Sequence, residues 1–194
     1  MKFTKLAAAM TLALAVSAAQ AVTVGTSTFK VKIQITGTCL AGSPSSFDTP
    51  VIAVEDIDFG SKVAATTNGV LTQSNTAANS LKVSCSKNLP VEIAMAPTNV
   101  ASTTGQGTMK SAIPANTDTV VYQLRQPSAT FAAGTAASPV WGSVSGTNTF
   151  AFKGAGLAAG QVISIPVTAT IDSTTALNVE ADSYEDNVTA TLTY

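Results

Sequence analysis

Apolar and polar residues alternate with a period of two along most of this chain. In one such run Leu81, Val83 and Cys85 alternate with Lys82 and Ser84. Such alternation is typical of β-strands with one buried face. The same pattern recurs in the segments 29–35, 52–59, 91–95, 120–124, 150–152, 162–171 and 188–194. Clusters of turn-forming residues separate these segments. The sequence therefore predicts an all-β antiparallel sandwich of about seven to nine short strands.

Residues 1–21 have the layout of a secretory signal peptide. Two lysines give a positive start, an apolar run over residues 6–16 follows, and small residues lead up to Ala21. The apolar run is shorter than the ~20 residues that a helix needs to cross a bilayer. We therefore expect cleavage after Ala21, a single mature domain over residues 22–194, and no membrane span after cleavage.

The chain contains two cysteines, Cys39 and Cys85. In an exported protein two such residues are expected to form a disulfide. The bond would close a loop of about 46 residues, and the chain-entropy model then gives roughly 4 kcal/mol of stabilisation. It would join two strand segments that are distant in sequence.

The sequence also excludes several kinds of chemistry. It contains no histidine, so Ser-His-Asp and Cys-His mechanisms are removed. Two cysteines without histidine do not make a zinc site. Signal cleavage removes two of the ten Lys and Arg residues and none of the eleven Asp and Glu residues. Acidic residues are then in excess, so the sequence offers no basic surface for nucleic acid. We expect a non-enzymatic protein with no catalytic, cofactor-binding or metal site, no cofactor and no nucleic-acid partner.

Some acidic residues and the one tryptophan allow other interpretations. Glu55, Asp56 and Asp58 form the densest acidic group and could serve a carboxylate-dependent hydrolase, although a solvated turn is the simpler interpretation. The acidic residues of segment 180–186 are interpreted as a solvated connection to the last strand. Trp141 could stack against a sugar, whereas a single tryptophan in a β-protein is more often part of the core.

A series of short motifs occurs in a defined order along the chain. They are Gly37-Thr38-Cys39 at the end of an alternating run, Ile57-Asp58-Phe59-Gly60, the second cysteine within a strand, Tyr122-Gln123-Leu124, Trp141-Gly142, and Tyr184-Glu185-Asp186 before the last strand. Together these motifs resemble the spore coat protein U domain, the pilin domain of archaic chaperone–usher pili such as the Csu pilus. The family's aromatic-Gly-Arg segment is replaced here by residues 167–171.

The resemblance implies an incomplete immunoglobulin-like sandwich that is completed by donor-strand complementation. A periplasmic chaperone would first lend a strand. An outer-membrane usher would then exchange that strand for the N-terminal segment of another identical or related pilin. The chain would be secreted through the periplasm and become a structural subunit of a cell-surface fibre, serving adhesion and biofilm formation.

The resemblance also assigns residues to the two ends of the chain. The donor segment is expected within residues 22–35, with Phe29, Val31, Ile33 and Ile35 as the side chains that insert. The acceptor groove is expected along the final strand, including Val188, Ala190, Leu192 and Tyr194. One alternative is that residues 29–35 form the first strand of a closed sandwich. Another is a monomeric secreted carbohydrate- or surface-binding module, with Trp141 or Tyr122 exposed beside a groove.

Overall fold

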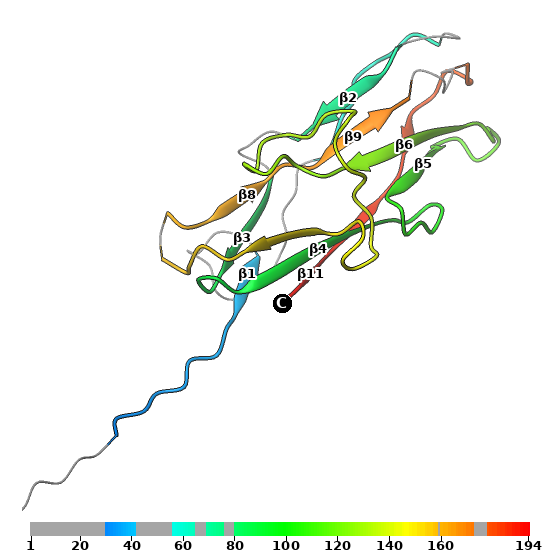
Figure 1. Ribbon diagram of the computed structural model, residues 1–194. Coiled ribbons are helices and arrows are strands. Elements are labelled where there is room, and N and C mark those ends of the chain that lie inside the picture. Colours follow the sequence, from blue (N-terminus) through cyan, green and yellow to red (C-terminus); the bar gives the residue numbers. More distant parts are fainter. Residues whose placement is uncertain (1–29, 42–55, 65–68, 76–79, 159, 173–177) are drawn as a thin grey trace, which may run out of the picture. The chain divides into compact units, whose positions relative to one another are not determined.

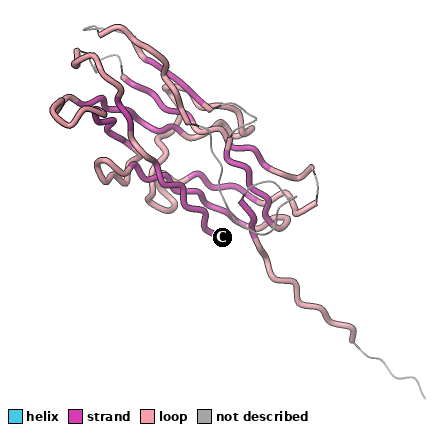
Figure 2. Tube along the Cα trace, turned by 180° about the vertical axis from the view of Figure 1, so that it is seen from behind, coloured by secondary structure: helices cyan, strands magenta, loops and turns pink. Residues whose placement is uncertain are grey.

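The computed structural model describes residues 30–41, 56–64, 69–75, 80–158, 160–172 and 178–194. Within these ranges every regular element is a β-strand, which confirms the all-β fold (Figures 1 and 2). No helix in these ranges is long and apolar enough to cross a membrane. The strands are β1 (Cys39–Ala41), β2 (Leu71–Ser74), β3 (Leu81–Cys85), β4 (Pro90–Pro97), β5 (Gln106–Ser111), β6 (Thr119–Arg125), β7 (Phe150–Lys153), β8 (Ile163–Ile165), β9 (Thr168–Ile171), β10 (Tyr184–Glu185) and β11 (Val188–Thr193).

The chain divides into two compact units, Met1–Ile35 and Thr36–Tyr194. In the first unit, residues 30–35 form no strand, and the side chains of Val31, Ile33 and Ile35 are 82–89% exposed. The half-buried strand predicted for residues 29–35 is therefore wrong over its described part. Alternation alone does not make a strand, because a strand also needs a paired neighbour, and residues 30–35 take part in no pairing of the described strands.

In the second unit the strands form two layers of antiparallel sheet. β2 pairs with β9, and the next strand, β3, pairs with β8. The stretch of chain that contains β2 and β3 therefore runs antiparallel to the stretch that contains β8 and β9. The first layer therefore joins the three-stranded sheet β1-β3-β8 to the five-stranded sheet β10-β5-β6-β9-β2. The second layer is the sheet β11-β4-β7, which we call the C-terminal sheet (Figure 1).

A break interrupts the long pairing between these strands. The sequence predicts one strand over residues 162–171, but the structure has two, separated at Pro166. Proline has no N–H to continue a ladder, so the hydrogen bonds must stop there. Asn75 spans the break, because its backbone N–H donates to the Val167 carbonyl (3.2 Å) and its side-chain oxygen accepts from the Val167 N–H (2.8 Å).

Alternation fixes which face of each strand is buried. In β4, Val91, Ile93 and Met95 are buried, while the residues between them are partly exposed. Trp141 lies in the same core with no exposed surface, and its indole N–H donates to the Ile93 carbonyl at 2.8 Å. A buried indole needs such a partner, and this bond holds the loop that carries Trp141 against the C-terminal sheet.

Cys39 and Cys85 form a disulfide between β1 and β3. The two residues are directly opposite each other in the antiparallel register, with their Cα atoms 4.1 Å apart. Cys85 is completely buried, and it lies in the same core cluster as Leu81 and Val83. The bond therefore ties a three-residue strand to the interior of the domain.

The structure contains strands that the sequence did not predict, and, besides the one over residues 29–35, it lacks a second strand that the sequence did predict. β2 and β5 are rich in threonine, glutamine and glycine, so they show little apolar alternation. Conversely, Ile57 and Phe59 pack against the core from a segment that forms no strand. That part of the predicted strand over residues 52–59 is wrong, and its earlier part lies outside the described residues.

We expect the double substitution Cys39→Ser/Cys85→Ser to lower the free energy of unfolding by about 4 kcal/mol, because the unfolded chain is no longer closed into a loop. Urea unfolding of the variant, of the wild type and of the reduced wild type would measure this effect. Equal urea midpoints for variant and wild type would contradict the structural role given to this bond.

Candidate functional site

A groove of about 980 Å³ lies between the five-stranded sheet and the C-terminal sheet. Its apolar lining includes Met95 from β4, Leu124 from β6, Ala169 from β9, and Val167 just before β9. These four side chains are only 1–5% exposed, so they belong to the core and present little surface to the groove.

The last strand, β11, forms one border of this groove. Among the described strands β11 pairs only with β4, so it is an edge strand of the C-terminal sheet. Val188 and Ala190 line the groove, and residues 188–193 contain neither proline nor a charged side chain. An edge without these features is well suited to pairing with another strand.

The chain changes layers immediately before β11, and Asp186 fixes this crossing. Its Oδ1 accepts a hydrogen bond from the Asn99 backbone N–H at 2.9 Å. Its Oδ2 accepts from the Tyr122 hydroxyl at 2.9 Å and from the Thr108 backbone N–H at 3.3 Å. The interpretation of segment 180–186 as a solvated connection is therefore wrong for Asp186, which connects β5, β6 and the β4–β5 loop to the start of β11.

Tyr122 supports this arrangement from β6 and also lines the groove. Its side chain lies over Gly107, its register partner on β5, where any Cβ would come within 2.4 Å of the tyrosine ring. Burial raises the pKa of the Tyr122 hydroxyl well above its usual value. The hydrogen bond to Asp186 and the negative charge of that carboxylate raise the pKa further.

The candidate donor residues belong to the first unit. Phe29 lies outside the described residues, and Val31, Ile33 and Ile35 are exposed, as described above. Three apolar side chains that are more than four-fifths exposed have no packing partner of their own. Their assignment as donors stays a prediction.

The four residues expected along the acceptor groove occupy different surroundings. Val188 and Ala190 line the groove, and Leu192 packs against the core cluster. Tyr194 lies one residue beyond β11 and borders a second hollow of about 560 Å³. Only the first half of the final strand therefore faces the groove.

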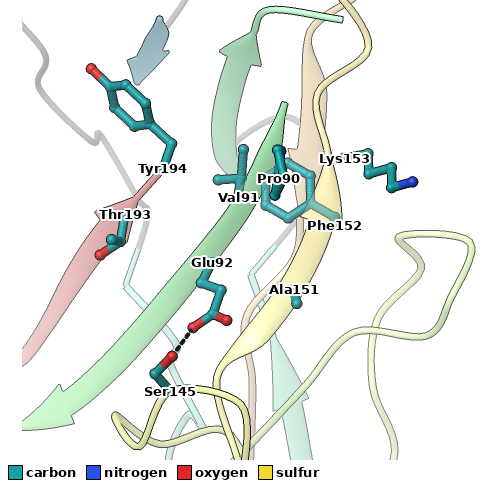
Figure 3. A pocket seen from close by; sticks show the side chains of 9 residues that line it. All are labelled: Pro90, Val91, Glu92, Ser145, Ala151, Phe152, Lys153, Thr193 and Tyr194. Atoms are coloured by element: carbon teal, nitrogen blue, oxygen red, sulfur yellow. Dashed lines mark hydrogen bonds between the residues drawn. The ribbon is translucent and has the colours of Figure 1, made fainter. Parts of the chain in front are cut away.

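The second hollow does not gather its polar groups around one point. Figure 3 shows Tyr194 and Lys153 on opposite sides of it, pointing away from each other. Oε2 of Glu92 accepts hydrogen bonds from the hydroxyls of Ser145 (2.7 Å) and Thr149 (3.1 Å), so this oxygen is bound by neighbouring side chains. We assign no site to this hollow.

The structure also bears on the alternative functions. Trp141 is entirely buried and Tyr122 is 6% exposed, so neither presents a ring for stacking on a sugar. Asp56 and Asp58 border the groove, while Glu55 lies outside the described residues. In the ranges that the structure covers, no three His, Cys, Asp or Glu side chains are grouped to hold a metal ion.

Fold and groove together define an antiparallel β-sandwich in which β11, paired on one side only among the described strands, lies beside a groove between the two layers. The model of the Spore Coat Protein U domain matches residues 25–191. The chain therefore belongs to the spore coat protein U domain family.

Two solved structures are similar to this chain at low identity. One is the CsuC–CsuE chaperone–tip adhesion subunit pre-assembly complex of archaic chaperone–usher Csu pili from Acinetobacter baumannii. It has 18% identity and a TM-score of 0.41, and the match covers 82% of this chain and 40% of that chain. The other is a chaperone–tip adhesin complex of CFA/I fimbriae biogenesis, with 17% identity, a TM-score of 0.41, and coverage of 80% and 42%. This chain thus spans about two fifths of each. Comparison with curated proteins gives no match.

Removing the Asp186 carboxylate should destabilise the crossing between the layers. We expect Asp186→Ala to lower the free energy of unfolding by about 3 kcal/mol, because three donors lose a charged acceptor. The matched control is Glu185→Ala, since the neighbouring carboxylate is exposed and should change stability by less than about 0.5 kcal/mol. Chemical unfolding of both variants would measure the difference, and similar losses would contradict the role of Asp186.

The raised pKa of Tyr122 predicts a loss of stability at alkaline pH. The folded protein keeps this hydroxyl protonated, whereas an unfolded tyrosine ionises near pH 10. Its contribution is therefore complete below about pH 10 and falls as the pH rises further. Tyr122→Phe should be less stable near neutral pH by about 1 kcal/mol, and this deficit should shrink above pH 10. Urea unfolding at pH 8 and pH 11 tests this, and a constant deficit would contradict it.

Proposed function

We propose that the mature chain, residues 22–194, is a structural subunit of a surface fibre of the archaic chaperone–usher kind. Such a subunit polymerises by donor-strand exchange, so the N-terminal segment of one copy completes the sandwich of another. It has a structural rather than a catalytic role, it is secreted through the periplasm, and the fibre serves adhesion and biofilm formation. A periplasmic chaperone, an outer-membrane usher and further pilins are its partners.

The groove beside β11 is the observation that carries this proposal. It combines an edge strand that pairs on one side only among the described strands with a groove lined by Met95, Leu124 and Ala169. A strand added along β11 would supply backbone hydrogen bonds to that edge. Every second side chain of the added strand would enter the groove.

The segment 30–35 has the properties that such an added strand needs. Val31, Ile33 and Ile35 have the two-residue spacing of one strand face, and all three are exposed. Fully burying a valine or isoleucine side chain contributes about 1.5–3 kcal/mol. Insertion of the three therefore gains several kcal/mol before the cost of ordering the segment.

The direction of the contact explains why a fibre would form rather than a closed dimer. The donor is at one end of the sequence and the groove lies beside its last strand, so the two surfaces are different. Contacts between two different surfaces are head-to-tail, and they propagate into an open chain of subunits. Membership of the spore coat protein U domain family and the motif resemblance to pilins support the same proposal.

A self-complemented variant tests this function. Residues 22–35 would be moved from the start of the mature chain to a flexible linker after Tyr194. Because several kcal/mol of apolar burial are gained, we expect a monomer that melts about 10–20 °C above the mature chain. Size-exclusion chromatography and thermal unfolding measure both properties.

The matched control carries the same appended segment with Val31, Ile33 and Ile35 replaced by serine. It has the same length and linker, and it should not be stabilised. If the mature chain is already a stable monomer, and if appending the unaltered segment adds nothing, the sandwich is complete and the proposal is wrong.

A further inference from the structure

The charged residues that border the groove between the two sheets are all acidic. Asp56, Asp58, Glu185 and Asp186 all line it, and none of its lining residues is lysine or arginine. Lys110, the register partner of Glu185 on β5, donates from its ammonium group to the Asn99 carbonyl at 3.2 Å. The four carboxylates together supply the negative charge around the groove.

Two of these carboxylates lie on the outer side of a chain segment whose apolar residues face inward. Ile57 and Phe59 pack against the core, whereas Asp56 and Asp58 are exposed. The Asp58 carboxylate accepts a hydrogen bond from the Gly60 N–H at 2.7 Å, and this bond fixes the local turn. The border of the groove is therefore apolar towards the core and acidic towards solvent.

The segment 30–35 has the complementary pattern. Lys30 and Lys32 alternate with Val31, Ile33 and Ile35, so a strand made of these residues has one apolar face and one cationic face. When the apolar face enters the groove, both lysines point outward. That is the side on which Asp56 and Asp58 lie.

We propose that this acidic border selects the segment 30–35 of a second copy of the chain by charge as well as by shape. The proposal rests on the proposed function, because it concerns how the same groove recognises its strand. Lys30 and Lys32 speed the encounter with the groove and set the register of the inserted strand.

The physical basis of the register is the period of two. A shift by one residue turns Lys30 and Lys32 towards the core and Val31 and Ile33 towards the acidic border. Burying an ammonium group without a paired charge is strongly unfavourable. The alternating charges therefore oppose the wrong register, while the apolar side chains favour the correct one.

A labelled synthetic peptide of residues 22–35 tests this inference on the mature chain. Association would be followed by fluorescence anisotropy at low and high salt, with the wild-type peptide and a Lys30→Glu/Lys32→Glu peptide. We expect the wild-type peptide to associate on the order of tenfold faster at low salt, and the difference to shrink as salt screens the charges.

Reversing the charge of one acidic residue in the protein provides the matched comparison. Asp56→Lys should slow the wild-type peptide and speed the Lys30→Glu/Lys32→Glu peptide. Glu180→Lys makes the same change in net charge at an exposed residue outside the groove lining, and it should alter neither rate by more than about twofold. Equal effects of the two protein variants would mean that only net charge matters, and would overturn the inference.

The outcomes separate this inference from the proposed function. If the wild-type peptide binds and raises the melting temperature but both peptides associate equally fast, selection by charge is wrong and strand acceptance stands. If the wild-type peptide neither binds nor stabilises the chain, both are wrong. A rate that depends on salt, together with rescue by Asp56→Lys, supports both.

Discussion

The crossing of the chain from one sheet layer to the other at Asp186 is the constraint on which the groove depends. β10 belongs to the five-stranded sheet and β11 to the C-terminal sheet, with only Asp186 and Asn187 between them. The Asp186 carboxylate binds donors from β5, β6 and the β4–β5 loop, so it fixes the point where the chain passes from one layer to the other. The direction in which β11 leaves this point determines where the edge of the C-terminal sheet lies, and therefore where the groove opens.

The sequence predicted those parts of the fold in which alternation alone decides burial. β3, β4, β6 and β11 lie within or around their predicted segments, because each has one face towards the core. β5 was missed, because Gly107 is not part of a turn. It is a glycine because the Tyr122 ring of the paired strand occupies the place of a Cβ. A glycine with that role cannot be distinguished from a loop glycine without knowing which strand lies opposite. The break at Pro166 could have been predicted from the sequence, since proline has no N–H to donate and interrupts a ladder wherever a donor is needed.

The sequence indicated that the last strand borders the site, but it did not indicate which other residues line the groove. The resemblance to pilins assigned the acceptor groove to the last strand, and the structure places Val188 and Ala190 at a groove between the two sheets. The contribution of the five-stranded sheet, with Leu124, Val167 and Ala169, follows from tertiary packing that no local pattern encodes. The same holds for Asp186, because an acidic residue in a polar stretch appears solvated until its three donors are known.

The disulfide between β1 and β3 has a consequence for mechanical load. In a fibre of the proposed kind, tension would enter the domain from the residues before Thr36 and reach Cys39 within four residues. From there the covalent bond passes the force directly to β3, which is paired on both of its edges, with β1 and with β8. The residues between the two cysteines are thus excluded from extension while the bond is intact. A pulled subunit would lengthen by only a few residues on this side before the sandwich itself had to yield.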